Sequence, residues 1–248
     1  MNNNPDILTN VFGYDENEVE YERVTSNLRG YDLDYGIEVI FNYWRKKGFP
    51  HYQVREDEKH THMRKLQKFD VDTIFKDNQI IQTMHCLRLA WTYFPHWVNV
   101  RCGNAPRTPM ETFMDDEKLR AVIKKCWRWC STQFAGEEGI DKNKFRENRF
   151  RQSLKIYTGT QAVSNFRPTA AKFIYEKFGG DVIWDMSCGW GGRLLGFLAS
   201  SRKKYIGTEP SSKTFEGLKK IRKDFFYLTK TVELHKLGSE VFEPKKES

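Results

Sequence analysis

A short segment around residue 185 combines the residue types of a ligand-binding turn. The apolar run "DVIWDMS", which starts at Asp181, is consistent with a buried parallel strand, and "CGWGGR" and "LLGFLASS" follow it directly. A glycine-rich turn between a buried strand and a helix lets a ligand approach the backbone closely. It also leaves the helix N-terminus facing polar groups. The sequence therefore predicts a strand, a turn and a helix around Asp185, Gly189 and Gly191.

The next expected strand, in "KKYIGTEP", ends at Glu209. An acid about twenty residues after the glycine turn can accept hydrogen bonds from both hydroxyls of a ribose. A dinucleotide site is the competing interpretation, but the GxGxxG pattern read from Gly189 has Leu194 at its last glycine position. Asp185 would oppose a pyrophosphate, whereas it suits an ammonium group. The residues favour a ligand with a ribose and an amino-acid moiety.

Three stretches resemble motifs of a known family. "DMSCGWGGR" (Asp185 to Arg193) resembles the first motif of S-adenosylmethionine (SAM)-dependent methyltransferases, and Glu209-Pro210-Ser211 resembles their acidic second motif. Upstream, "SNFRPTAAKFIYEKF" resembles the F-x-P motif of amino-DNA methyltransferases. Over about residues 159–243 the chain is similar to phage and bacterial adenine-N6 or cytosine-N4 DNA methyltransferases. The resemblance implies an α/β fold, with a partial Rossmann-like SAM-methyltransferase sheet preceded by a mostly helical N-terminal region, and SAM as the cofactor.

The same resemblance implies a set of cofactor contacts. Phe166 and Pro168 would line the methionine pocket with Asn165 nearby, and Glu240 or Ser239 would contact the adenine. The complete expected set is Phe166, Pro168, Asp185, Ser187, Cys188, Gly189, Gly191, Gly192, Glu209, Pro210 and Glu240.

Structural roles remain open for several of these residues. Asp185 could cap the following helix, Phe166 and Pro168 could be ordinary helix-entry residues, and Trp190 could pack over the turn. Arg193 pairs with an acid or points to solvent, so it is assigned no chemistry. Cys188 is not expected to be a nucleophile, because nothing nearby supplies a paired base.

The sequence departs from the family at the catalytic motif. Amino-group methyltransferases carry Asp/Asn/Ser-Pro-Pro-Tyr/Phe after the fourth strand, which orients the amine and stacks on the flipped base. The eight prolines of this chain include no adjacent pair, and no Pro-Cys pair occurs. No catalytic residue is therefore assigned.

Three parallel strands are expected at about residues 182–186, 204–208 and 231–235. The family's sheet normally has seven strands with the glycine strand near its middle, so this strand is expected to form an open, apolar edge. We expect a second polypeptide to supply the remaining sheet and catalytic motif, or the chain to self-associate or to be a truncated product.

The chain is expected to divide into a flexible acidic leader (1–30), a helical region (31–155) that could contact DNA, and the SAM-binding portion (156–248). Along the chain, helices are expected at Ile37, Ile40, Phe41 and Trp44; over 56–68, where the helix is expected to be exposed; at Ile80, Met84, Leu87 and Trp91; after a capping box at Thr108, Pro109 and Glu111; and from Asp116 to Cys130.

The net charge of +8 makes nucleic acid a plausible partner, and DNA is expected. The run "DKNKFRENRFRQSLK" (141–155) holds six Lys/Arg, with Phe145 and Phe150 interleaved. It fits either a phosphate-gripping segment or a solvated helix with a buried Phe stripe. Two alternatives to a DNA methyltransferase are an RNA methyltransferase and a catalytically inactive nucleic-acid-binding or regulatory subunit that retains a SAM pocket.

The five cysteines are scattered and form no disulfide framework or CxxC pair. Cys126 and Cys130 are expected as buried apolar side chains on one helix face, and His60 and His62 as a chance pair. No metal site is expected. With no signal peptide or long apolar run, we expect a soluble cytoplasmic protein of a bacterial or phage-infected cell, with no membrane contact.

Overall fold

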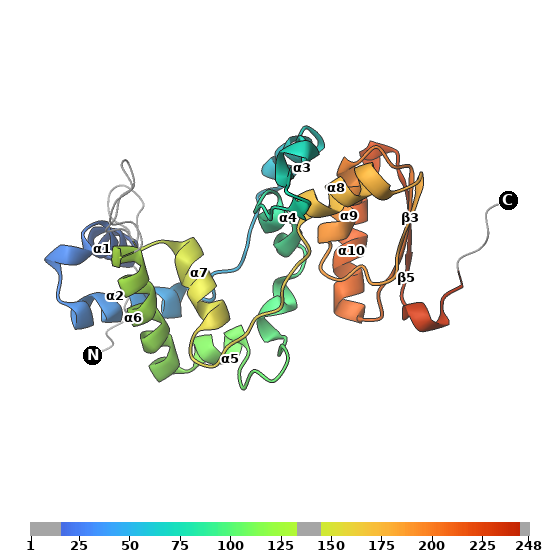
Figure 1. The fold of residues 1–248 in the computed structure, drawn as a ribbon. Coiled ribbons are helices and arrows are strands. Elements are labelled where there is room, and N and C mark those ends of the chain that lie inside the picture. Colours follow the sequence, from blue (N-terminus) through green and yellow to red (C-terminus); the bar gives the residue numbers. More distant parts are fainter. Residues whose placement is uncertain (1–15, 133–144, 244–248) are drawn as a thin grey trace. The chain divides into compact units, whose positions relative to one another are not determined.

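The structure is a computed structural model that describes residues 16–132 and 145–243 (Figure 1). The chain is a mixed α/β protein that divides into two compact units, and each unit is built from two separate stretches. Unit 1 comprises Met1–Pro50 and Trp97–Val163, and unit 2 comprises His51–His96 and Ser164–Ser248. This division differs from the expected boundaries at residues 30 and 155.

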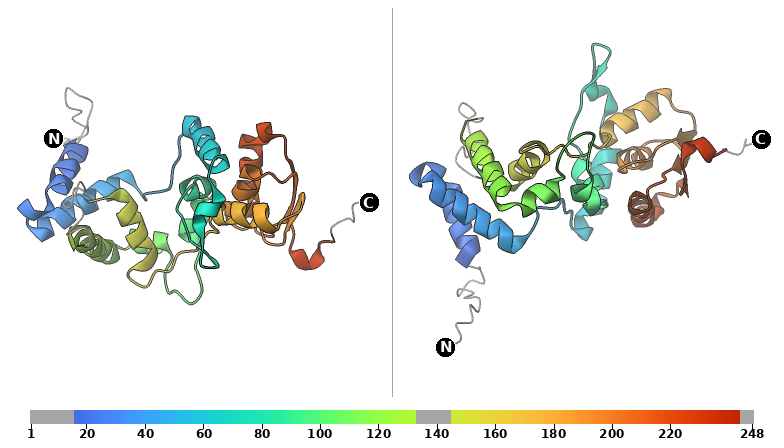
Figure 2. Two further views of the ribbon diagram at one scale, coloured as in Figure 1. Left: turned by 45° about the horizontal axis from the view of Figure 1, so that its top comes forward. Right: turned by 90° about the horizontal axis from the view of Figure 1, so that it is seen from below.

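Unit 1 is helical. Its helices are α1 (Glu16–Ser26), α2 (Leu33–Lys47), α5 (Pro109–Met114), α6 (Asp116–Thr132) and α7 (Glu147–Ile156). Helices α2, α6 and α7 lie side by side (Figures 1 and 2). The expected stripe of α2, from Ile37 to Trp44, is buried among them, and Gly48 ends this helix with its N–H donating to the Trp44 carbonyl. The predicted helix is confirmed.

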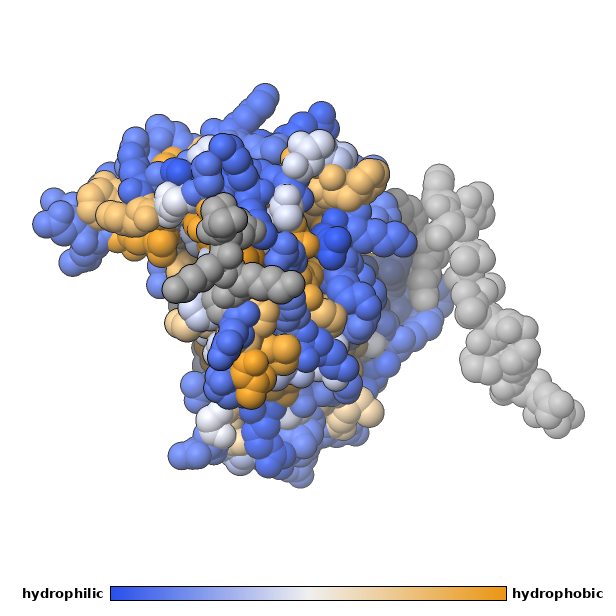
Figure 3. Space-filling view, turned by 90° about the vertical axis from the view of Figure 1, so that its right-hand side faces the viewer, coloured by the Kyte–Doolittle hydropathy of each residue, from blue (hydrophilic) through white to orange (hydrophobic). Residues whose placement is uncertain are grey.

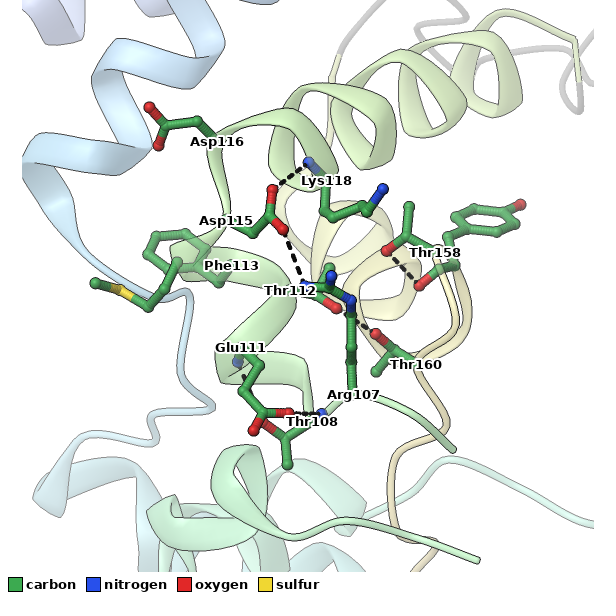
Figure 4. A network of polar contacts seen from close by, with 12 residues as sticks. Arg107, Thr108, Glu111, Thr112, Phe113, Asp115, Asp116, Lys118, Thr158 and Thr160 are labelled. Carbon is green, nitrogen blue, oxygen red and sulfur yellow. Dashed lines mark hydrogen bonds and ion pairs between the residues drawn. The ribbon is translucent and has the colours of Figure 1, made fainter. Parts of the chain in front are cut away.

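The predicted capping box begins α5. The Thr108 hydroxyl accepts from the Glu111 N–H at 3.1 Å, and the Thr108 N–H donates to the Glu111 carboxylate at 2.7 Å (Figure 4). Both orphan donors at the start of the helix are thereby satisfied. Nearby, the Arg107 guanidinium donates to Asp115 at 2.9 Å, which fixes the junction between α5 and α6.

Part of the predicted leader belongs to the helical core. Residues 16–30 form α1 and the 3₁₀ helix Leu28–Gly30, in which Val24 and Leu28 are buried. Apolar residues spaced along an acidic helix bury one face while the charged face stays in water. Acidic composition alone therefore does not indicate a flexible segment. Residues 1–15 lie outside the described residues.

The basic run has its aromatic residues inside. Phe145 and Phe150 are buried, as the buried-stripe interpretation predicts, and residues 141–144 lie outside the described ranges. Arg151 is buried, with its Nε donating to the Pro50 carbonyl at 2.5 Å and its side chain paired with Glu147. Lys155 lies over the Trp97 ring. These cations are engaged within unit 1, which favours the structural role of the run.

Cys126 and Cys130 of α6 are also buried, as expected of apolar side chains. Among the described residues no cluster of His, Cys, Asp and Glu could hold a metal ion. Across the same ranges, every helix is too short or too polar to cross a membrane.

Unit 2 combines helices with a parallel sheet. Its elements are α3 (Glu56–Gln67), β1 (Phe75–Lys76), β2 (Gln79–Ile80), α4 (Leu87–Thr92), α8 (Pro168–Phe178), β3 (Val182–Asp185), α9 (Gly192–Ala199), β4 (Lys204–Thr208), α10 (Ser212–Asp224), the 3₁₀ helix η4 (Phe226–Leu228), β5 (Thr231–His235) and the 3₁₀ helix η5 (Ser239–Val241). The three strands predicted from the sequence are confirmed.

The predicted helix from Ile80 to Trp91 is wrong over its first half. Ile80 lies in β2, Met84 is exposed, and only α4 is helical. Asp77 and Asn78 have φ values of 50° and 57°, which make the tight turn between β1 and β2. Short polar side chains tolerate this left-handed conformation, so a hairpin forms where the apolar spacing favoured a helix.

The parallel sheet has the order β3-β4-β5. Right-handed crossovers in one direction place α9 and α10 on the same face. Ile183, Tyr205 and Val232 share a row across the sheet and join the hydrophobic core. The alternate residues of β3, Val182 and Trp184, are 44% and 45% exposed. Figure 3, viewed from the side of the sheet, shows hydrophobic patches between hydrophilic residues. Within the described residues β3 has one strand neighbour, so it is an open edge, as predicted.

Residues 51–96 join unit 2 through packing and one buried cation. The Lys172 ammonium of α8 donates to the carbonyls of Leu66, Gln67 and Phe69 at 3.2, 2.8 and 2.9 Å. Burial lowers the pKa of this ammonium. A cation at the last carbonyls of α3 satisfies acceptors that the helix itself leaves unpaired. Lys172 therefore fixes α3 against α8.

Candidate ligand-binding site

The glycine turn links the end of β3 to the start of α9. Gly191 adopts φ 75°, and a Cβ there would lie 2.6 Å from Ile221 and 2.8 Å from Phe94. A Cβ on Gly192 would lie 1.9 Å from the Phe166 carbonyl oxygen. Only glycine fits both positions, so the turn packs directly against the segment before α8.

A second contact joins the same segment to the turn. The buried Asn165 amide donates to the Trp190 carbonyl at 2.7 Å. Trp190 in turn packs against Trp91, Phe94 and His96, with ring centroids 5.1 to 5.8 Å apart. The F-x-P segment and the glycine turn are therefore held as one wall, although they are far apart in the sequence.

Glu209 lies beneath the turn at the end of β4. One carboxylate oxygen accepts from the Gly189 N–H at 3.0 Å, and the other accepts from the Ser211 N–H at 2.9 Å. The side chain is only 7% exposed. The two expected motifs, glycine turn and second acid, are therefore in direct contact.

Asp185 is at the centre of a separate polar cluster. Its Oδ2 accepts from the Arg193 Nε at 2.8 Å and from the Tyr205 hydroxyl at 2.5 Å, while Oδ1 accepts from the Ser187 N–H. Burial disfavours the Arg193 cation, but the Asp185 charge and hydrogen bond outweigh it, so the pKa of Arg193 is raised. Arg193 therefore stays charged, and Asp185 fixes its orientation.

A cleft of about 630 Å³ opens beside this wall. Its lining includes Phe166, Ser187, Cys188 and Gly189 from the expected set. It also includes Ile80, Gln82, Ser164, Asn165, Arg167, Ala170, Ile174, Trp190 and Arg193. A volume of this size accommodates a nucleoside-sized ligand.

The other expected contacts, Glu209 among them, lie outside this lining. Asp185 faces a smaller adjoining hollow, which Arg193 and Ser187 share with the cleft. Pro168 is buried at the first position of α8, and Gly191 and Gly192 shape the turn. Pro210 is exposed after Glu209, and Glu240 is exposed in η5.

The charge of the cleft is the feature that sequence reasoning missed. Arg167 and Arg193 both line it, whereas no carboxylate is among its described lining residues. Phe166, 40% exposed, lies under the Arg193 guanidinium at 5.6 Å. Burial raises the pKa of the Cys188 thiol to about 12, so this residue is a protonated, apolar part of the lining. The cleft is thus suited to a ligand with one anionic group.

Comparisons of the chain with protein-family models, with curated proteins and with solved structures give no match.

Proposed function

We propose that unit 2 is the SAM-binding part of a methyltransferase that acts on the exocyclic amine of adenine or cytosine in DNA. The observation that carries the proposal is the contact between Glu209 and Gly189, because it brings the acid after β4 under the glycine turn after β3. An acid and a turn arranged in this way suit a ribose and its attached groups.

Residues in and beside the cleft would contact different parts of SAM. Trp190 and Phe166 offer aromatic surfaces within the cleft. Glu209 lies outside the lining, beneath Gly189, and would accept from the ribose hydroxyls with the lone pairs that its two backbone hydrogen bonds leave. Arg193 would hold the methionine carboxylate, since Asp185 already fixes its Nε and leaves its outer nitrogens for a ligand. In this scheme Asp185 orients Arg193 rather than taking the ammonium group itself. SAM supplies an electrophilic methyl group.

A second candidate ligand follows from the charge of the cleft. Two arginines and no lining carboxylate, among the described residues, also suit a phosphate-bearing nucleotide. SAM carries one carboxylate against an ammonium and a sulfonium, whereas ADP carries only anionic groups. A cleft lined by two arginines therefore attracts every charged group of ADP, but only the carboxylate of SAM.

The test is calorimetric titration of the full chain with SAM and, separately, with ADP. We expect SAM to bind with a dissociation constant near 1 μM, about −8 kcal/mol. Arg193→Gln and Glu209→Gln should each weaken binding at least about tenfold. Arg55→Gln, which removes an exposed guanidinium outside the cleft, is the matched control. Tighter binding of ADP would favour the nucleotide alternative, and no binding of either ligand by the folded chain would refute the site.

Methyl transfer needs a further test, because the sequence contains no Pro-Pro motif. Transfer of a labelled methyl group from SAM to DNA, assayed with the chain alone and with candidate partner polypeptides, separates an enzyme component from an inactive subunit that retains the pocket. Transfer to RNA in preference to DNA would change the substrate class.

A further inference from the structure

A second surface of unit 2 combines cations with an exposed aromatic ring. It is formed by the last turns of α10 and by η4, in the stretch "LKKIRKDFFY" from Leu218. We define the basic-aromatic surface by six exposed residues: Lys219, Lys220, Arg222, Lys223, Phe226 and Tyr227.

Phe226 is the centre of this surface. Its side chain is 79% exposed, and it lines two adjoining hollows of about 500 and 480 Å³. Lys223 also lines both hollows. An exposed aromatic ring among cations is the combination with which single-strand-binding proteins stack a base and contact its phosphates. The exposed ring offers a surface on which a planar group can stack.

The cations around Phe226 are available for a ligand. Among the described residues, the side chains of Lys220 and Arg222 make no hydrogen bond or ion pair, and Lys219 pairs with exposed Glu216 at 3.0 Å. The two acids of the second hollow are already bound, since the Lys59 ammonium contacts both Glu56 and Asp224 at 2.7 Å. The surface therefore carries a local excess of positive charge.

We infer that the basic-aromatic surface binds single-stranded nucleic acid. Lys220, Arg222 and Lys223 would contact backbone phosphates while an unpaired base stacks on Phe226. A duplex keeps its bases stacked on each other and would leave the ring without a partner. An anionic membrane would match the charges but would not require a flat ring.

This surface is separate from the ligand cleft. The cleft lies at the carboxyl end of β3, whereas Lys230 and Val232, at the start of β5, line the hollow beside Phe226. Strands β3 and β5 run in the same direction, so these sites lie at opposite ends of the sheet. The inference thus stands or fails apart from SAM binding.

Fluorescence anisotropy of a labelled oligo-dT strand, titrated with the full chain, tests the inference. Lys220→Gln/Arg222→Gln should weaken binding and lower the slope of log affinity against log salt by about 1.4, since each phosphate contact contributes about 0.7. Phe226→Leu should weaken binding roughly 5- to 100-fold, because one stacked base is lost.

Matched controls sharpen the result. Lys68→Gln/Lys76→Gln removes two exposed cations of unit 2 outside both hollows, and Phe178→Leu alters another exposed ring, 76% exposed. Both controls should bind like the wild type, and all variants should retain SAM binding. Equal losses in test and control variants, tighter binding of a matched duplex, or binding to anionic vesicles but not to oligo-dT would overturn the inference.

Discussion

The carboxylate of Glu209 accepts a hydrogen bond from the Gly189 backbone N–H at 3.0 Å. Gly189 lies in the turn after β3, Glu209 directly follows the neighbouring parallel strand β4, and Glu209 is almost fully buried. The charge of this acid is therefore directed at the backbone of the turn rather than at solvent. Glu209 thereby holds in place the turn that lines the cleft.

We expect Glu209→Ala to lower the free energy of unfolding by about 1–3 kcal/mol, because it leaves the Gly189 N–H without its acceptor. Urea unfolding followed by circular dichroism measures the change. Glu216→Ala removes an exposed acid and should alter stability by less than about 0.5 kcal/mol. Equal effects of the two substitutions would contradict a structural role for Glu209.

Gly192→Ala should destabilise unit 2 by about 1–3 kcal/mol, because the added methyl group would overlap the Phe166 carbonyl oxygen. The same substitution should weaken ligand binding, since it pushes the glycine turn away from the F-x-P segment, and residues of both line the cleft. Gly180→Ala is the matched control, as its Cβ would meet no atom within 4 Å. Thermal unfolding and SAM titration of both variants check this prediction, which fails if the two behave alike.

Stability should fall as the pH is lowered through the range in which His96 titrates. Burial, with a smaller effect of Lys213, lowers the pKa of His96 in the folded chain. The folded state therefore disfavours protonation of His96. Neutral His96 costs no stability above its unfolded pKa of about 6.5, whereas below that pH the unfolded chain takes up a proton more readily than the folded chain, and stability falls. His62, whose pKa burial also lowers, acts in the same direction.

Urea unfolding between pH 7.5 and 5 measures this dependence. His96→Gln should give a shallower loss of stability than the wild type, with the remaining slope due to His62. His85→Gln, which changes an exposed histidine, should keep the wild-type slope. A His96 variant with an unchanged profile would contradict the assignment.

The open edge at β3 should promote self-association. Val182→Lys places a charge on this edge and should shift the chain toward monomer, with a stability change within about 0.5 kcal/mol. Sedimentation velocity over a concentration series measures the effect. Val19→Lys alters an equally exposed valine of α1 and should leave association unchanged, so loss of association in both variants would locate the contact elsewhere.

The local elements of the site could be predicted from the sequence. Strands β3, β4 and β5 lie where short apolar runs indicated them, and the capping box of α5 follows directly from Thr108 and Glu111. Both signals are confined to a few neighbouring residues. Such signals depend little on the rest of the fold.

The tertiary parts of the site could not be predicted in this way. The role of Arg193 depends on its approach to Asp185 across the turn, and Gln82 reaches the cleft from a hairpin that apolar spacing had favoured as a helix. Apolar periodicity reports which face of an element is buried, but it does not report what covers that face. For the same reason the sequence did not show that residues 51–96 belong with the sheet.

Because unit 2 is built from two stretches separated by part of unit 1, it can fold only after its second stretch has been synthesised. Residues 51–96 leave the ribosome early. Their side chains Met63, Leu66, Leu89 and Phe94 nevertheless share one core with residues of α9 and α10, which are synthesised much later. Until α9 and α10 have been synthesised, the apolar side chains of residues 51–96 stay exposed in the nascent chain, where chaperones can bind them or they can associate wrongly. A fragment that begins at the F-x-P segment would keep the three stretches that resemble methyltransferase motifs. It would lack Phe94, whose ring packs against Gly191 in the glycine turn.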